Sequence, residues 1–494
     1  MTATAAEPAR VQGSLWRPMV LAMGKTGGAS IASGLLSALG TKVIASMLGP
    51  GSVALLQTLQ QLRDGAVTAA TTNGKTALVH GASALEGIER REYVRTVMLF
   101  FAIGTVAVVL AMVAVPGTVA AWNKLPASMG KLLGWLVGTV ALLSMFVFMT
   151  AVLNALKEIG KLALLQLASP LVAAIVAWPA VTAIRSGHPV GMMLFLAIPA
   201  AASVGAAVIA FRGHRDELAY WFRGPGRWWS SEAARGFLSI SGAMLVSGLA
   251  ATATLLAVRA SITHHQGLAI TGPFDAAWNI SMNHVTLILA SVQAYYLPTL
   301  SSAKSSRERK EQIRGMLMLA ALASVPVIVA IASLKPVVIG LLYSSQFAAS
   351  PGFLRWTLMG DYLKVSSWVL ATPMIAAGNL GAFLLFDLLT QAAFFGAAIG
   401  FAKVLEAAEG AAIGFLISYA IYFALCYAFA RAKFGFRFGG AGLCAWLGGL
   451  LLVGGASASA WSDRAAHLAN AACWIALAAT FSAGFAIYMR RRDA

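Results

Sequence analysis

Charged residues are scarce in this sequence. Asp, Glu, Lys and Arg together make up 11% of its 494 residues, whereas a soluble globular protein carries roughly 25%. This scarcity excludes an ordinary water-soluble domain. Apolar residues make up 59% of the chain, which at about 20 residues per crossing is enough for roughly 14 membrane-spanning helices. The composition therefore predicts an all-α polytopic membrane protein.

Cysteines and catalytic signatures are scarce as well. No paired spacing that would indicate a disulfide framework or a thiolate metal site is found among Cys426, Cys444 and Cys473. Residues 24–26 and 74–76 read Gly-Lys-Thr but lack the leading glycine of a phosphate-binding loop, which argues against ATP binding. No nucleophile elbow is present, and His264 and His265 are expected in a solvated loop. We therefore expect a protein that is not an enzyme and holds no cofactor and no metal.

Apolar windows bounded by charged or turn residues predict where the chain crosses the membrane. The fourteen predicted spans are 18–48, 51–79, 95–116, 131–156, 161–184, 190–211, 235–260, 272–299, 312–342, 353–377, 381–402, 409–431, 440–457 and 467–489. The first 17 residues are polar and lack the apolar core of a signal peptide, so we expect no cleavage there.

Basic residues outnumber acidic ones by 36 to 18. They gather between apolar spans, a pattern typical of membrane topology signals and not of nucleic-acid binding. The clusters fall on alternate loops, at 81–95, 157–161, 212–235, 301–314, 431–437 and 490–492. The positive-inside rule places these loops and both termini in the cytoplasm. The 212–235 loop mixes tryptophan with arginine and is predicted to lie on the headgroup surface.

The chain also looks duplicated. Gly49-Pro50 precedes the second span and Gly272-Pro273 opens the eighth, and each of these spans is followed by a basic loop. This predicts an N-terminal six-helix lobe at 1–211, a cytoplasmic linker at 212–235, a C-terminal six-helix lobe at 236–432, and two appended helices with a basic tail at 433–494. Repeats of this kind enclose a central substrate site between the two pseudo-symmetric lobes.

Charged residues inside the spans mark the candidate site, because each costs at least about 2.5 kcal/mol at the bilayer centre. The basic candidates, assigned to substrate binding, are Lys25, Lys42, Arg63, Lys75, Arg259 and Lys364. The acidic candidates, assigned to ion coupling, are Asp64, Asp275, Asp361 and Asp387. A cavity that carries several cations predicts an anionic substrate, with phosphate or pyrophosphate as the natural choice.

Structural alternatives remain open for some of these charges. Asp361 and Lys364 share one helical face and can neutralise each other. Lys42 and Arg259 lie near helix ends and can reach the membrane interface. Arg63 and the adjacent Asp64 point in different directions, so we do not expect them to pair.

Several segments resemble the Wzx-type lipid-linked oligosaccharide flippases of the MOP (multidrug/oligosaccharidyl-lipid/polysaccharide) exporter superfamily, particularly the enterobacterial common antigen lipid III flippases. The resemblance extends over about the first 430 residues. The segments that carry it are 42–50 (KVIASMLGP), Gln61-Leu62, Asn73-Gly74, 296–301 (YLPTLS), Ser345-Gln346-Phe347, 360–365 (GDYLKV) and 422–426 (YFALC).

The resemblance implies spans 1–6 packed against spans 7–12 around a cationic cavity. It implies a flippase that moves undecaprenyl-pyrophosphate-linked oligosaccharide from the cytoplasmic to the periplasmic leaflet of the bacterial inner membrane by alternating access. The product would serve O-antigen, common antigen or exopolysaccharide synthesis. Positions that carry a like charge in similar proteins are Lys42, Arg259, Asp361, Lys364 and Asp387.

The chain also departs from the family pattern. The eighth span has Met282 where relatives carry an Ile-Ser-Asp run, so that Asp275 is the candidate replacement, and the lysine after Asn73-Gly74 is displaced to Lys75. The last two helices are extra relative to the most similar members. Coupling to a proton or sodium gradient would use the acidic candidates, and the candidate partners besides lipid and glycan are a polysaccharide polymerase and a chain-length regulator. The alternative functions are a cation-coupled multidrug exporter of the same superfamily and a membrane-embedded glycan polymerase or ligase.

Overall fold

The structure is a computed structural model that describes residues 16–114, 133–188, 190–214, 219, 221, 223–302, 305–405, 407–458 and 464–493. The described residues form α-helices joined by short turns, with no strand among them. The prediction of an all-α protein is therefore confirmed.

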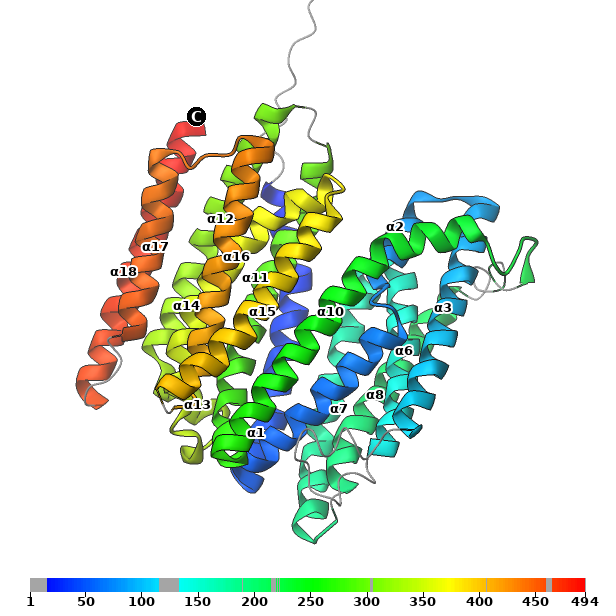
Figure 1. Cartoon of the computed structure of the whole chain (residues 1–494), viewed down its shortest axis with the longest axis horizontal. Helices are drawn as coiled ribbons and strands as arrows, with labels where there is room; N and C mark the ends of the chain where they lie inside the picture. Colours follow the sequence, from blue (N-terminus) through cyan, green and yellow to red (C-terminus); the bar gives the residue numbers. More distant parts are fainter. Residues whose placement is uncertain are drawn as a thin grey trace, which may run out of the picture.

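The helices form two groups that stand side by side (Figure 1). The N-terminal lobe contains α1 (Trp16–Ala70), α2 (Lys75–Ala84), α3 (Gly87–Ala114), α6 (Leu133–Ala155), α7 (Ile159–Arg185) and α8 (Val190–Phe211). The C-terminal lobe contains α10 (Ser231–Gln266), α11 (Leu268–Ser302), α12 (Ser306–Ser333), α13 (Lys335–Leu342), α14 (Ser350–Ala376), α15 (Leu380–Val404) and α16 (Gly410–Phe434). The appended helices are α17 (Gly440–Ala458) and α18 (Arg464–Asp493), and short 3-10 turns form η1 (Arg212–His214) and η2 (Ser345–Phe347). The two lobes converge at the lower end of Figure 1 and diverge toward its upper end.

Eleven helical segments of the described chain are long and apolar enough to cross a membrane. That set counts α1 and α2 as one segment, although α1 changes direction at Gly49, whose φ of 78° is in the left-handed region. It also leaves out α11 and α14, which have 35 and 27 residues. With α1 divided at Gly49 and these two helices included, one helix corresponds to each of the fourteen predicted spans. The protein is a multi-pass membrane protein.

Two of the predicted spans each contain two helices. The span at 51–79 stops at Ala70, and Thr72 and Asn73 adopt φ values of 48° and 47° before α2 begins. The span at 312–342 breaks at Leu334, because Pro336, in the first turn of the new helix α13, lacks the amide hydrogen that would continue α12. His264 and His265 are not in a loop. They lie in the last turn of α10, where only Gly267 separates α10 from α11.

The linker between the lobes is anchored to α3. Arg95 donates hydrogen bonds to the carbonyls of Trp221 (2.6 Å), Gly224 (2.8 Å) and Gly226 (2.9 Å). Arg91 donates to the carbonyl of Pro225. Both arginines are almost fully buried. Arginine offers five donors in a planar fork, so the two guanidinium groups can bind several carbonyls of the linker at once. Arg91 and Arg95 therefore hold the linker in place, in addition to acting as topology signals.

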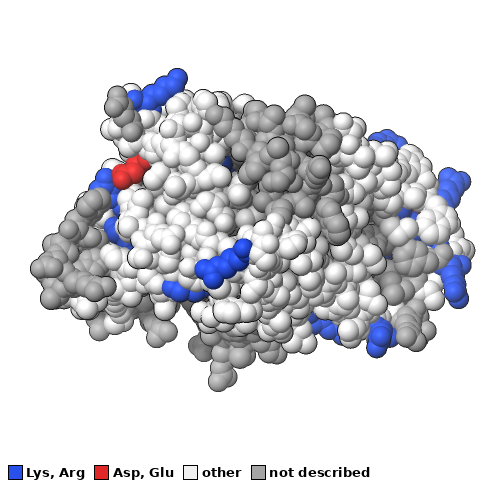
Figure 2. All heavy atoms as spheres, turned by 90° about the horizontal axis from the view of Figure 1, so that it is seen from below, with Lys and Arg blue, Asp and Glu red and all other residues white. Residues whose placement is uncertain are grey.

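The loops predicted to share one side of the membrane lie close to each other within the C-terminal lobe. Arg314 donates to the carbonyl of Arg437 at 3.2 Å, and Arg309 lies over the ring of Phe434. The C-terminus lies at the same upper end as the start of α10 (Figure 1). Seen from below, the opposite face consists mostly of uncharged residues with scattered Lys and Arg side chains (Figure 2). Residues 215–218 and 303–304 of the basic loops are outside the described chain.

The appended helices are joined to the C-terminal lobe by buried polar contacts. Tyr362 of α14 donates to the carbonyl of Trp446 at 2.8 Å, and the Trp446 indole donates to Ser366 at 2.9 Å. Lys335 at the start of α13 donates to the carbonyl of Ser457 at 2.8 Å. The appended helices thus contact α14, which also carries the candidate site residues Asp361 and Lys364.

Candidate functional site

The two Gly-Pro pairs that mark the repeat lie against each other where the lobes converge. A Cβ atom added to Gly272 of α11 would collide with the backbone carbonyl of Pro50 in α1. This position therefore requires glycine for close helix contact between lobes. The first half of α1 continues this contact, because Lys42 donates to the carbonyl of Gly340 (2.7 Å) and to that of Tyr343 in and after α13. Lys42 thus joins the two lobes at the lower end.

The second half of α1 runs along α10. Gln61 faces Arg259, Gly65 faces Thr252, and Asn73 donates its amide to the carbonyl of Met244 at 2.7 Å. We call this line of contacts the α1–α10 seam. It joins residues 61–73 of the N-terminal lobe to residues 244–259 of α10.

Arg259 and Asp275 form a buried ion pair at the lower part of the seam. The Arg259 Nε lies 2.6 Å from the Asp275 Oδ1, and the exposed fractions of the two residues are 2% and 0%. A second Arg259 nitrogen is 3.4 Å from the amide oxygen of Gln61 in the other lobe. The second carboxylate oxygen of Asp275 has no hydrogen-bond partner among the described residues. In this conformation the guanidinium group of Arg259, predicted to bind substrate, is occupied by the Asp275 carboxylate. Asp275 is the candidate replacement for the acidic residue that relatives carry at the position of Met282, and its carboxylate is occupied by the same ion pair.

Arg63 and Asp64 pair with each other, contrary to the sequence prediction. The Arg63 Nη2 and Nε lie 2.8 Å and 2.9 Å from the Asp64 Oδ1. Although neighbouring Cβ atoms on a helix diverge, the arginine side chain is long enough to fold back across one helix position. The Asp64 side chain is 59% exposed and that of Arg63 is 18% exposed. The pair is therefore within reach of a ligand.

A second polar cluster lies inside the C-terminal lobe around Asp361 of α14. Ser281 of α11 donates to the Asp361 Oδ1 at 2.8 Å, and the His284 Nε2 is 3.3 Å from the Oδ2. Asp361 is fully buried and His284 nearly so. His284 is not among the candidates predicted from the sequence, because its partner is on another helix and no spacing pattern connects the two residues.

Lys364 does not form an ion pair with Asp361, which was the structural alternative for these two residues. Its ammonium group is 3.2 Å from the Met282 sulfur and lies over the rings of Phe415 and Tyr419 at 5.8 Å and 5.3 Å. Aromatic rings attract cations through their negative faces. The Lys364 ammonium group is thus held by a sulfur atom and two aromatic rings, and not by a carboxylate of the described residues.

Asp387 of α15 accepts a hydrogen bond from Ser247 of α10 at 2.7 Å. This contact lies on the side of α10 that faces the C-terminal lobe. The structure therefore brings three acidic and two basic candidates of that lobe onto neighbouring helices, namely Asp275, Asp361, Asp387, Arg259 and Lys364.

Two basic candidates lie apart from this group. Lys75 is the first residue of α2, at the far end of the seam, and is exposed. Lys25 is in α1, but its side chain is outside the described part of the structure. The single cavity cluster predicted for Lys25, Arg63 and Lys75 is therefore not visible as one group. No group of three His, Cys, Asp or Glu side chains within the described residues is arranged to hold a metal ion.

The arrangement of the helices matches the fold of solved membrane transporters. The Lipid II flippase MurJ in an inward closed conformation has a TM-score of 0.70 at 12% identity, covering 95% of this chain and 99% of that one. A multidrug resistance MATE family transporter of the MOP superfamily, in an inward-facing conformation, has a TM-score of 0.65 at 14% identity, covering 81% and 94%. At these identities the likeness establishes the fold.

Two curated proteins are also similar to this chain in sequence. Proteins named Lipid III flippase from Escherichia coli (strain K12) and Shigella flexneri are each 27% identical over 246 residues, which is 49% of this chain and 57% of their own length. The chain therefore matches little more than half the length of these curated relatives. No family model matches the chain. The predicted resemblance is confirmed for the two-lobed fold. Because the MurJ match leaves out only 5% of this chain, it includes part of the appended pair, which the resemblance had left without a counterpart.

Proposed function

We propose that the protein is a flippase that carries a polyprenyl-pyrophosphate-linked oligosaccharide from the cytoplasmic to the periplasmic leaflet of a bacterial inner membrane. One observation carries the proposal. Within a MOP-type fold, Lys42 of α1 and Arg259 of α10 contact the opposite lobe, and Arg63, with a partly exposed side chain, lies in the part of α1 that runs along α10. The name of the sequence relatives, Lipid III flippase, supports the same substrate class.

The chemistry of the substrate explains why such cations are needed. A pyrophosphate cannot enter hydrocarbon unpaired, because burying an isolated charge is prohibitively unfavourable. Arginine and lysine side chains replace water around phosphate oxygens through charge-assisted hydrogen bonds. The polyprenyl tail needs no such replacement and can stay in the lipid while the headgroup crosses between the lobes.

Alternating access requires the contacts at the lower end to break. These contacts are the Gly272–Pro50 approach and the bonds from Lys42 to the α13 carbonyls. Their release would free Lys42, and movement along the seam would separate Gln61 from Arg259. The same motion that opens the lower end thus exposes cations that are satisfied by protein groups in the present conformation.

The driving force that we propose is a proton or sodium gradient. Asp361, which is fully buried, and Asp387, which is partly buried, are the carriers supported best by the geometry, since neither pairs with an arginine within the described residues. Asp275 is less suited because Arg259 holds it. The termini are proposed to be cytoplasmic, and a polysaccharide polymerase and chain-length regulator are proposed partners.

Depletion of the protein in its native host tests the proposal. We expect loss of one surface polysaccharide and accumulation of its lipid-linked repeat unit on the cytoplasmic leaflet. An Arg63→Gln variant should reproduce this defect and Arg63→Lys should rescue it in part, because lysine keeps the charge but loses the bidentate fork. Arg235→Gln is the matched control, since Arg235 is exposed in the first turn of α10. Unchanged polysaccharide together with increased drug sensitivity would favour the multidrug exporter instead.

A further inference from the structure

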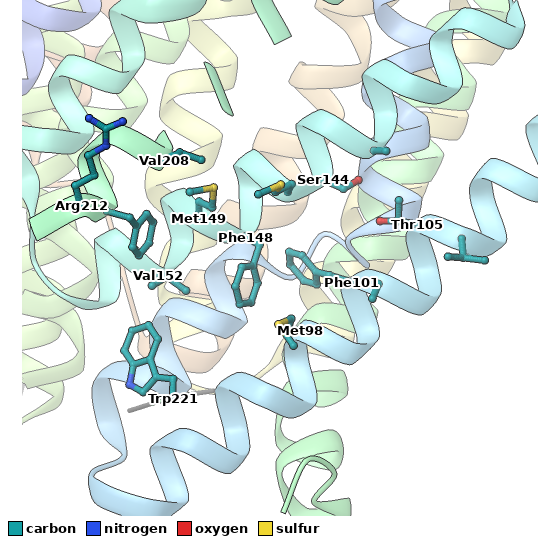
Figure 3. A pocket seen from close by; sticks show the side chains of 15 residues that line it. Met98, Phe101, Thr105, Ser144, Phe148, Met149, Val152, Val208, Arg212 and Trp221 are labelled. Carbon is teal, nitrogen blue, oxygen red and sulfur yellow. The ribbon is translucent and has the colours of Figure 1, made fainter. Parts of the chain in front are cut away.

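The N-terminal lobe contains a cavity of about 850 Å³ that is separate from the contacts between the lobes. It is bounded by α3, α6 and α8, with Arg212 of η1 and Trp221 of the linker at one end (Figure 3). Its volume lies in the range of ordinary small-molecule sites. We call this space the lateral groove, because several of its lining residues are also exposed on the outer surface of the lobe.

The lateral groove opens toward the surrounding membrane. Val106 of α3, Met145 of α6 and Val208 of α8 line it and are 58%, 49% and 45% exposed. Its floor is formed by buried side chains, Phe101 and Val152 among them. A hydrocarbon chain can therefore enter sideways from lipid without crossing a polar surface.

The dimensions and lining suit one hydrocarbon chain of one leaflet. The groove follows α3 from Met98 to Val106, which is about 12 Å at 1.5 Å per residue. Half of the hydrocarbon core of a bilayer is about 15 Å thick. Met98, Met145 and Met149 contribute flexible thioethers, which adapt to irregular apolar shapes.

One end of the groove is positively charged. Arg212 is exposed there and has no ion pair with any described residue. The nearby carboxylate of Glu158 is already contacted by Lys161 (3.5 Å) and His214 (3.1 Å). Trp221 closes the same end and is fixed by the buried Arg95, which holds its carbonyl at 2.6 Å. A fixed indole and a guanidinium that has no ion pair among the described residues both line the groove, and such groups suit the boundary between hydrocarbon and headgroups.

From this geometry we propose that the lateral groove is a binding site for an anionic glycerophospholipid of the leaflet that faces the basic loops. One acyl chain lies along α3 between the methionines, and the phosphate contacts Arg212 beside Trp221. Charge complementarity at Arg212 favours an anionic headgroup over a zwitterionic one. Because the groove reaches neither α1 nor α10, this lipid would be a stable companion of the N-terminal lobe and not the transported molecule.

Native mass spectrometry of the full-length protein in detergent tests this assignment, with palmitoyl-oleoyl phosphatidylglycerol and phosphatidylcholine as probes. We expect tighter binding of phosphatidylglycerol to the wild-type protein. Arg212→Gln should weaken that lipid about tenfold, the loss expected for one charge-assisted hydrogen bond, and leave phosphatidylcholine unchanged. Arg223→Gln, the same charge change on an exposed linker residue, should have no effect.

A bulky residue in the groove tests the chain position. Ala102→Trp should lower the affinity for both lipids, whereas Leu110→Trp, on the exposed surface of α3 outside the groove, should not. If Ala102→Trp does not fold, Val208→Trp serves the same purpose from α8. Equal losses for Arg212→Gln and Arg223→Gln, or full binding with the groove filled, would overturn the proposal. Displacement of phosphatidylglycerol by equimolar polyprenyl phosphate would also overturn it, because the groove would then belong to an isoprenoid.

Discussion

The Arg259–Asp275 pair allows stability and transport to be separated by mutation. Both residues are buried, and Arg259 provides the only hydrogen bond to the Asp275 carboxylate among the described residues. Removing one partner leaves an uncompensated charge, which typically costs about 3–5 kcal/mol. Arg259→Met and Asp275→Leu should therefore each lower the free energy of unfolding by that amount.

The double variant Arg259→Met/Asp275→Leu should behave differently. Replacing a whole buried ion pair by apolar residues of similar size is often neutral or stabilising, so its free energy of unfolding should return close to the wild-type value. A double-mutant cycle measured by unfolding in detergent gives the coupling energy directly. A double variant as unstable as the sum of the two single variants would refute the reasoning.

Transport by the same double variant addresses the substrate. If Arg259 binds pyrophosphate once the lobes rearrange, the stable double variant should still fail to export glycan. Wild-type export would remove Arg259 from the substrate site while leaving its structural role intact. This comparison is sharper than Arg259→Ala alone, because the single change confounds loss of folding with loss of binding.

Three further predictions concern other parts of the molecule. Gly272→Ala should lower the free energy of unfolding by about 1–3 kcal/mol, because the added methyl group meets the Pro50 backbone. Gly315→Ala is the control, since nothing lies within 4 Å of a Cβ atom added at Gly315. Equal effects of the two changes would contradict the close contact at Gly272. Lys335 is buried and donates a hydrogen bond to the carbonyl of Ser457 at 2.8 Å. Lys335→Met should lower the free energy of unfolding by about 1–3 kcal/mol, because the buried carbonyl loses its donor, and an unchanged midpoint of thermal unfolding would contradict this contact. In a chain freed of native cysteines, Arg307→Cys should resist an impermeant reagent in intact cells while His264→Cys is labelled; the reverse pattern would invert the topology.

The sequence was sufficient for the helices because hydropathy directly measures the property that a bilayer selects. All fourteen predicted spans correspond to helices, and the Gly-Pro pairs of the repeat do meet at the lobe junction. Averaging over apolar windows could not detect the breaks at 71–74 and at Leu334. These depend on the backbone angles of Thr72 and Asn73 and on the missing amide of Pro336.

Side-chain partners were the harder part of the prediction. Cβ directions suggested that Arg63 and Asp64 diverge, yet the length of arginine lets them pair. Asp361 and Lys364 share a helical face, yet each prefers groups on other helices. His284 carried no local signal, because its contact with Asp361 exists only after α11 and α14 pack together. Charges in the spans therefore indicate candidate site residues, whereas tertiary packing decides how these residues pair.

Transbilayer movement in proteoliposomes is the direct assay of the proposed flippase activity. Vesicles would carry a polyprenyl-pyrophosphate-linked oligosaccharide with a fluorescent sugar, and a membrane-impermeant quencher would report how fast inner-leaflet label reaches the outer leaflet. We expect wild-type protein to accelerate this movement over protein-free vesicles. Arg63→Gln should slow it at least about tenfold through loss of a charge-assisted hydrogen bond, whereas Arg235→Gln should not. Movement no faster than in protein-free vesicles, or equal rates for wild type and Arg63→Gln, would contradict the proposal.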